Sequence, residues 1–287
     1  MLHKRYANYY GIYSLVLWSI TATMAVRLSH LPAFEVLAAI NLFGFLGCCV
    51  VNSYYRLWGK ILQHPTWVIV LGTLGILGND YCYILAFHYA PPSHIDMVSY
   101  LWPLLLLLGS SIWFRQPLAR DEMVAVGVAF LAVMGLMFSD SWTLWQYEFL
   151  KGYGLAFLGA ILWVVYLISA KSYGKDAREL FTIYTFIGTI LFSLLYYYDS
   201  TYVTPTALDM VSLFIMGCFS QCLAYICWDF AIKYGQVTFL AMCAYLSPAL
   251  SIVWLVILGH TNASLQLLLS LCALTYAMWL QQHLADS

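Results

Sequence analysis

The chain alternates long apolar runs with short polar or Pro- and Gly-containing borders along its whole length. About 20 apolar residues in a helix are enough to cross the roughly 30 Å hydrocarbon core of a membrane. Residues 6–26 form one such run, in which tyrosine is the only ionisable residue type. Following each run to its borders predicts ten membrane-spanning helices, at residues 9–28, 34–55, 65–88, 94–114, 121–139, 152–171, 180–198, 208–231, 235–259 and 264–282.

Two of these predicted helices carry a proline inside the apolar run, in the segments SYLWPLL (99–105) and AYLSPAL (244–250). A proline in a helix interior removes a backbone hydrogen bond and costs about 3 kcal/mol. In a membrane, the freed carbonyl group is tolerated only where protein or a wet cavity covers it. We therefore expect both breaks to face the protein interior, with Pro103 and Pro248 as candidate hinges.

The composition excludes a soluble protein, because 63% of the residues are hydrophobic and only 9% are charged. The first apolar run is too long for a signal peptide and has no small-residue cleavage site before Arg27, so a first membrane helix is expected. The eight cysteines lie in apolar segments, which predicts neither disulfides nor a metal site. A net charge of -1 without a basic stripe gives no sign of a nucleic-acid partner. The predicted class is an all-α integral membrane protein.

Lysine and arginine predict the orientation, because they accumulate in cytoplasmic loops. With the N-terminus inside, only Arg27 and Lys151 fall outside. The other ten basic residues fall inside: Lys4, Arg5, Arg56, Lys60, Arg115, Arg120, Lys171, Lys175, Arg178 and Lys233. Both termini are therefore expected in the cytoplasm, in a multi-pass protein of a bacterial inner membrane.

An offset of 145 positions superposes the two proline segments without a gap. Tyr100 then falls on Tyr245 and Pro103 on Pro248, and the same shift carries Trp18 onto Trp163. This predicts two five-helix repeats, residues 1–145 and 146–287, which we call the first and second halves. Five helices per half is an odd number, so the second half must enter the membrane from the opposite side. Inverted repeats are typical of secondary transporters, which bind substrate where the halves meet.

Other classes receive less support from the sequence. His-Glu-x-x-His, Gly-x-Ser-x-Gly and a Gly-rich phosphate loop with lysine are all absent, so neither an enzyme nor ATP use is predicted, and no cofactor. A channel would show rings of charge or repeated pore motifs, and neither is visible. A passive channel and a non-transporting membrane scaffold remain as alternatives.

With ten predicted spans, the repeat and the paired Tyr-Leu-x-Pro segments, the sequence resembles the EamA-type branch of the drug/metabolite transporter superfamily over nearly its whole length. The segment YLWPLLLLL (100–108) is similar to the fourth-helix segment of bacterial aromatic amino acid exporters. This resemblance implies export from the cytoplasm through a central cavity, without ATP hydrolysis. One departure is Asn41, where EamA-type proteins commonly have an arginine.

Aromatic amino acids need an apolar slot for the ring, and their ammonium group gains about 0.5–2 kcal/mol over an aromatic face. The aromatic residues deep inside predicted helices are Tyr81, Tyr83, Tyr100, Trp102, Trp163, Tyr166, Tyr225, Trp228 and Tyr245. Because 17% of the residues are aromatic, many must instead belong to interfacial belts. Tyrosines at helix ends, such as Tyr54 and Tyr197, fit that alternative.

Asp80 is the clearest ionisable residue inside a predicted span. A carboxylate in hydrocarbon costs about 2.5–3.5 kcal/mol on insertion scales, which makes it a functional hypothesis by default. With its neighbour Asn79 it could bind the ammonium group, and it could also carry a proton. The alternative is a structural hydrogen bond between helices.

The remaining ionisable candidates have simpler explanations. Asp229 has Lys233 one turn later, so we expect an ordinary surface ion pair. His94 is a candidate gate, but capping of the helix by Ser93 explains His94 and Asp96 almost as well.

Together these observations predict a secondary transporter that exports aromatic amino acids by alternating access, working in the lipid bilayer as a monomer. Other amino acids or small metabolites are the alternative substrates. An asymmetric ligand should sit where the repeat symmetry fails, and Trp102 opposing Ser247 is the strongest such position. The predicted substrate-binding residues are Asn79, Asp80, Tyr83, Tyr100, Trp102, Trp163, Tyr225, Trp228 and Tyr245.

Overall fold

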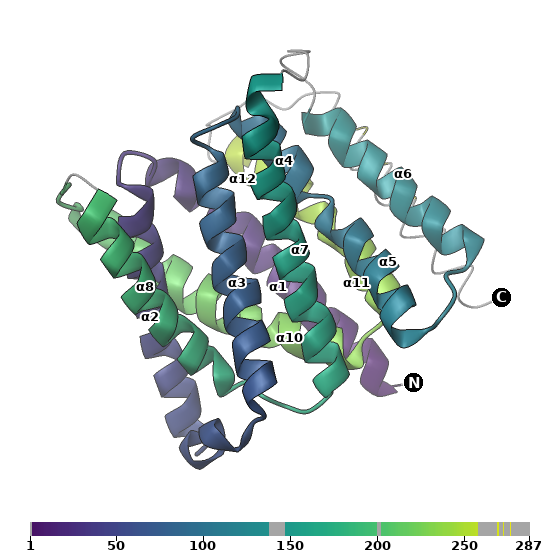
Figure 1. The fold of residues 1–287 in the computed structure, drawn as a ribbon, viewed down its shortest axis with the longest axis horizontal. Helices are drawn as coiled ribbons and strands as arrows, with labels where there is room; N and C mark the ends of the chain where they lie inside the picture. Colours follow the sequence, from purple (N-terminus) through teal and green to yellow (C-terminus); the bar gives the residue numbers. More distant parts are fainter. Residues whose placement is uncertain are drawn as a thin grey trace.

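The computed structural model describes residues 2–137, 147–199 and 202–257, together with residues 269, 272 and 276. These residues form helices and contain no strand, which confirms the all-α prediction for this part of the chain. The helices pack side by side as a bundle (Figure 1). In chain order they are α1 (Leu2–Arg27), α2 (Ala33–Tyr54), the 3-10 helix η1 (Trp58–Gln63), α3 (Thr66–Ala86), α4 (Pro92–Ser99), α5 (Trp102–Phe114), α6 (Arg120–Met137), η2 (Tyr147–Phe149), α7 (Leu150–Tyr173), α8 (Leu180–Asp199), α9 (Ala207–Ile215), the π-helix η3 (Met216–Ala224), α10 (Tyr225–Tyr234), α11 (Val237–Ala244) and α12 (Leu246–Ile257).

Five helical stretches of the described chain are long and apolar enough to span a membrane. They are Ala33–Tyr54, Thr66–Ala86, Tyr147–Tyr173, Leu180–Tyr198 and Ala207–Tyr234. Helices α1, α4 with α5, α6, and α11 with α12 overlap four further predicted spans. The tenth, at 264–282, lies outside the described residues apart from 269, 272 and 276. The count of ten inverted spans therefore stays a prediction.

Both Tyr-Leu-x-Pro segments interrupt their helices at the tyrosine. Helix α4 ends at Ser99 and α5 begins at Trp102, while α11 ends at Ala244 and α12 begins at Leu246. Each proline therefore lies in the first turn of the following helix rather than in a helix interior. Proline is well tolerated there because its missing N–H group would have no helical partner. The expected cost of an interior proline is thus avoided, and that expectation was wrong.

Helices from the two halves pack closely against each other. Helix α3 packs on α7 and α2 packs on α8 (Figure 1), and glycine allows close approach. A Cβ atom on Gly75 of α3 would lie 2.4 Å from the Cβ of Tyr166 on α7. A Cβ atom on Gly217 of η3 would lie 2.8 Å from the carbonyl oxygen of Ile40 on α2. Small residues at such crossings let backbones approach in the manner of membrane helix pairs.

Basic residues gather at the end of the bundle where the chain begins, which we call the basic end. The connections α2–α3, α5–α6, α7–α8 and α10–α11 lie at this end (Figure 1), and the basic residues in or next to them are Arg56, Lys60, Arg115, Lys171, Lys175, Arg178 and Lys233. His64 joins the two halves at this end, because its ring nitrogens lie 2.8 Å from the Tyr173 hydroxyl and 2.8 Å from Glu179. At the opposite end, Asp209 lies 3.2 Å from His30. Each end of the bundle therefore carries a polar contact between the halves.

Candidate functional site

A central cavity of about 410 Å³ lies between the two halves, which is within the range of about 300–1,000 Å³ for small-molecule sites. Its apolar and aromatic lining is Leu15, Trp18, Leu37, Ile40, Tyr83, Tyr100, Trp102, Ala160, Trp163, Met216, Tyr225 and Ala244. Its polar lining is Asn79, Asp80, Asp96, Ser99, Ser220, Gln221, Ser247 and Ser251. The cavity is thus mostly apolar, with polar groups concentrated at a few positions.

Two carboxylates give the cavity its charge, and both come from the first half. Asp80 lies on α3 beside the side-chain amides of Asn79 and Gln221. Its Oδ2 atom is buried and has no hydrogen-bond partner among the described residues. Asp96 on α4 accepts a hydrogen bond from the Tyr83 hydroxyl. No lysine or arginine is among the described residues that line the cavity, so its electrostatic field favours a positively charged group.

Four tryptophan rings form one side of the cavity and the layer behind it. Trp102 stands edge-on to Trp163, with ring centroids 6.2 Å apart and an interplanar angle of 87°. Trp18 packs on Trp163 at 6.2 Å and on Trp228 at 5.5 Å. The Trp102–Trp163 and Trp18–Trp163 pairs are edge-to-face, and such pairs add about 0.5–1.5 kcal/mol each beyond burial, while Trp18 and Trp228 are tilted by 58°. The cluster holds its rings in defined orientations, which suits a surface for stacking.

The π-helix η3 brings the polar side chains of Ser220 and Gln221 to the cavity from a mostly apolar segment. A π-turn shifts the residues that follow it around the helix axis, and such segments are frequent at functional sites. Ser220 and Gln221 of η3 and Tyr225, the first residue of α10, all line the cavity. Gln221 is 6% exposed, so little solvent reaches it to compete with its contact to Asp80.

Seven of the nine predicted substrate-binding residues line this one cavity: Asn79, Asp80, Tyr83, Tyr100, Trp102, Trp163 and Tyr225. The other two are fully buried behind it. Trp228 packs its ring against Trp18 and Trp102, and Tyr245 packs on Phe130 at 6.1 Å. These two residues support the cavity from the layer behind its lining.

Other aromatic candidates lie elsewhere. Tyr81 stacks on Phe34 at 6.2 Å, outside the cavity lining. Tyr166 donates a hydrogen bond to Asp229.

The candidate gate His94 is buried and lies 2.8 Å from the Tyr153 hydroxyl on α7. Both Pro103 and Pro248 are buried next to the helix breaks.

Two expectations about ionisable residues were wrong. Asp229 and Lys233 do form an ion pair, at 2.5 Å, but it is buried, with side chains 8% and 2% exposed, and not at the surface. Their helix continues α9 and η3, and residues of α7 and α8 surround the pair, with Tyr166 of α7 donating to Asp229. Helix α4 has Pro91 rather than Ser93 as its N-cap residue, because the carbonyl of Pro91 accepts the first helical hydrogen bonds.

Sequence reasoning missed several cavity residues. Trp18 could have been found, because the offset of 145 places it on the predicted site residue Trp163. Gln221 carries the signal of an amide inside an apolar span. The serines at 99, 220, 247 and 251 carry none, since serine is common in membrane helices. Asn41, the departure from the family pattern, lies outside the central lining and donates a hydrogen bond to the Leu37 carbonyl.

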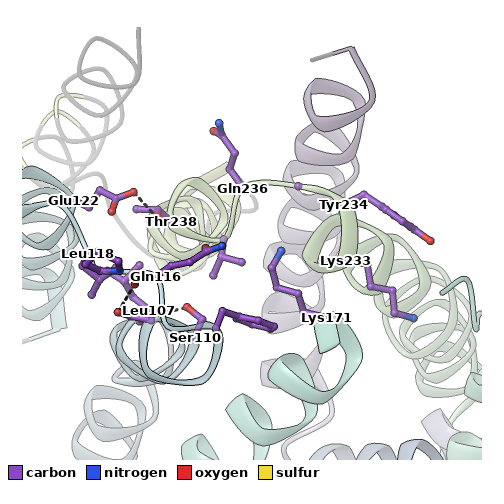
Figure 2. A pocket seen from close by; sticks show the side chains of 15 residues that line it. Leu107, Ser110, Gln116, Leu118, Glu122, Lys171, Lys233, Tyr234, Gln236 and Thr238 are labelled. Atoms are coloured by element: carbon purple, nitrogen blue, oxygen red, sulfur yellow. Dashed lines mark hydrogen bonds between the residues drawn. The ribbon is translucent and has the colours of Figure 1, made fainter. Parts of the chain in front are cut away.

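A second cavity, of about 470 Å³, lies at the basic end between the α5–α6 connection, α7 and the α10–α11 connection. Figure 2 shows Lys171 reaching from α7 toward the segment that carries Gln236, while Lys233 points to the other side of its helix. The Lys171 amine donates a hydrogen bond to the carbonyl of Ile232, and Glu122 accepts one from Thr238. The lining of this second cavity is mostly polar.

Comparison with known proteins gives a consistent picture. The EamA-like transporter family matches residues 5–138 and again residues 150–280. The aromatic amino acid exporter YddG of Ancylobacter novellus is 25% identical over 276 residues, covering 93% of each chain. YddG of Escherichia coli K12, also named an aromatic amino acid exporter, is 24% identical over 266 residues, covering 86% of this chain and 87% of its own.

A solved crystal structure shares the fold, with a TM-score of 0.91 over 98% of this chain and 99% of its own at 23% identity. The two family matches begin at residues 5 and 150, the same offset of 145 positions that superposes the proline segments. The matches together cover most of the chain, and the described helices include several that are apolar enough to span a membrane. The chain therefore belongs to the EamA-like transporter family and is a multi-pass membrane transporter rather than an enzyme.

Proposed function

We propose that this protein is a secondary transporter that exports aromatic amino acids from the cytoplasm by alternating access. The observation that carries the proposal is the central cavity, where the unpartnered Oδ2 of Asp80 lies in the same space as the rings of Trp102 and Trp163. A carboxylate and an aromatic surface are what the ammonium group and the side chain of such a substrate require. The relatives named aromatic amino acid exporters support the same substrate class.

In this proposal each end of the substrate has a partner. The ammonium group pairs with Asp80, and the aromatic ring lies against Trp102 and Trp163. The substrate carboxylate finds donors in the side-chain amides of Asn79 and Gln221 rather than in a basic residue. Neutral donors bind a carboxylate less tightly than arginine does, which suits a transporter that must release its substrate.

The proposed membrane arrangement is ten spans in two inverted halves, residues 1–145 and 146–287, with both termini in the cytoplasm. The basic residues gathered at one end support it, because that end would face the cytoplasm. Reporter fusions after Ser287 should then report a cytoplasmic location, and fusions near Ser141 an external one. Opposite results at both sites would contradict the topology.

The direct test uses the purified protein in proteoliposomes, with radiolabelled phenylalanine, tyrosine and tryptophan, with and without a proton gradient. Saturable flux with counterflow is the expected result. Linear, non-saturating flux would favour a channel, and the absence of flux for every substrate would favour a scaffold.

One observation favours a second candidate, an exporter of small aromatic cations. The described cavity lining carries two carboxylates and no lysine or arginine, which suits a ligand with a positive charge alone. Phenethylamine distinguishes the candidates, because it keeps the ring and the ammonium group of phenylalanine but lacks the carboxylate. Stronger competition by phenethylamine than by phenylalanine would favour the cation exporter.

A further inference from the structure

Two small voids with overlapping linings lie between the central cavity and the basic end. A void of about 10 Å³ shares Gln221 and Tyr225 with the central cavity. A second void of about 10 Å³ shares Phe181 and Tyr184 with the first. The Lys233 side chain lines this second void, and its residue borders the basic-end cavity although the side chain points away from that cavity (Figure 2). These overlapping linings mark a path along α10 from the central cavity to Lys233, and the two voids on it are too small for a substrate.

The Asp229–Lys233 ion pair lies at the end of this path nearer the basic end. The Lys233 amine lies 2.5 Å from the Asp229 carboxylate, and both side chains are buried. The Tyr166 hydroxyl donates a further hydrogen bond of 3.2 Å to Asp229. All three residues line the void next to the basic-end cavity. The lining at this end of the path thus pairs an acidic side chain with a basic one.

Opening such a path is costly unless something replaces the broken pair. Separating two buried charges leaves each of them uncompensated in a low-dielectric environment, which is strongly destabilising. A neutral molecule offers neither charge, and a singly charged molecule can satisfy only one partner. An α-amino acid zwitterion carries an ammonium group for Asp229 and a carboxylate for Lys233, so it compensates both.

We propose that Asp229 and Lys233 form a second binding site for the zwitterionic head of an α-amino acid, where the substrate exchanges for the ion pair as it passes. This inference rests on the proposed export of amino acids and adds a site that selects for the presence of both charges. The ammonium group pairs with Asp229 and the carboxylate with Lys233 while the path is open. The ion pair re-forms behind the substrate and closes the path.

The same end of the protein provides a matched control. Arg178 and Asp176 also form an ion pair at 2.5 Å, but their side chains are 30% and 52% exposed, in the α7–α8 connection. Neither residue lines any of the four spaces described above. An exposed pair exchanges with water at little cost, so it should not select the substrate.

The test measures counterflow of radiolabelled phenylalanine in proteoliposomes, with phenethylamine and 3-phenylpropionate as competitors that each keep one of the two charges. In Asp229→Asn, Lys233 remains unpaired. Phenylpropionate should therefore become about tenfold more potent relative to phenethylamine, as judged by the ratio of their half-inhibitory concentrations, which is equivalent to about 1.4 kcal/mol. In Lys233→Gln, Asp229 remains unpaired, and phenethylamine should become about tenfold more potent relative to phenylpropionate. Asp176→Asn with Arg178→Gln should leave the ratio unchanged.

Opposite shifts in the two single variants would support the second site. Shifts in the same direction, or no shift, in protein that exchanges phenylalanine would overturn it and leave the pair as a structural contact. If the single variants do not fold, the charge-exchanged variant Asp229→Lys with Lys233→Asp takes their place. Wild-type preference for phenylalanine over both competitors in that variant supports the site, and loss of the preference overturns it. If wild-type protein exchanges none of the three compounds, the proposed function itself fails, and the inference fails with it.

Discussion

The two halves of the chain present different chemistry to the same cavity, although a single offset superposes their sequences. Asp80 of the first half corresponds to Tyr225 of the second, and Trp102 corresponds to Ser247. All four residues line the cavity, yet both of its carboxylates, including that of Asp96, come from the first half. A duplicated scaffold thus forms an asymmetric site, which an asymmetric substrate requires.

The two helix breaks differ in the same way. Tyr100 lines the cavity, whereas its counterpart Tyr245 is fully buried and packs on Phe130 of α6. The difference arises from packing, because α11 contacts α6 while α4 mainly contacts α7. Equivalent sequence positions therefore have different roles, and paired substitutions can measure how different these roles are.

The largest effect is expected for Asp80→Asn, with Tyr225→Phe at the corresponding position as its control. An amide cannot take up and release a proton, so accumulation of phenylalanine against its gradient should fall to background, while counterflow should persist with a weaker apparent affinity because the ammonium group loses its charged partner. Tyr225→Phe keeps the ring and carries no charge change, and it should retain uphill transport. Uphill transport at the wild-type rate in Asp80→Asn would show that Asp80 is structural.

A smaller effect is expected for Trp102→Ala compared with Ser247→Ala. Loss of a large aromatic contact should weaken the apparent affinity for aromatic substrates by roughly 1–3 kcal/mol, as for hot-spot aromatic residues. Ser247→Ala removes only a hydroxyl group and should change the affinity by less than about 1 kcal/mol. The apparent affinity of each variant is measured from the dependence of counterflow on substrate concentration, using monodisperse protein. Unchanged affinity in Trp102→Ala would leave the substrate class as an unspecified metabolite.

The prolines test whether both breaks act as hinges. Pro103→Ala and Pro248→Ala each restore a backbone N–H group that can continue the helix across the break. We expect turnover to slow by about three- to tenfold with little change in affinity, since a hinge acts on the rate of switching. An effect of Pro103→Ala alone would show that only the first half bends. Loss of affinity without slower turnover would contradict the hinge role at either position.

The smallest effects concern the two tyrosine hydroxyl groups. Tyr100→Phe removes a hydroxyl from the cavity and should weaken substrate binding by about 0.5–1.5 kcal/mol. The Tyr245 hydroxyl is buried without a hydrogen-bond partner among the described residues, so Tyr245→Phe should leave binding unchanged and should not lower the melting temperature. A destabilised Tyr245→Phe protein would reveal a partner for that hydroxyl. Equal losses of affinity in both variants would contradict the asymmetry of the breaks.

Much of the fold could be predicted because its signals are local. Apolar run length predicts a membrane helix without reference to any neighbour. The Tyr-Leu-x-Pro segments indicated where the helices at 94–114 and 235–259 break, because proline has no N–H group for the carbonyl four residues earlier, and Ser99 and Ala244 at that position end α4 and α11. Asp80 and Trp102 could be selected as site residues since a buried charge and a failure of the repeat symmetry are both visible in one sequence.

Other features could not be predicted, because they depend on which helices come together. The sequence placed Asp229 and Lys233 one turn apart but could not show that α7 and α8 surround them. Likewise, Trp228 and Tyr245 carry the same local signals as Trp163 and Tyr100, yet they lie behind the cavity. The π-helix that brings Gln221 beside Asp80 has no sequence signature of its own.

The sequence by itself determined that the chain forms apolar helices, where two of them break and that the pattern repeats after 145 positions. These properties follow from side-chain hydrophobicity and backbone geometry, which each residue carries wherever it is placed. Only the tertiary structure decided which equivalent residues face the cavity and which ion pair is buried across the path. Burial and access depend on the packing of helices distant in the sequence, so the asymmetric site arises from the arrangement of the two halves rather than from either half alone.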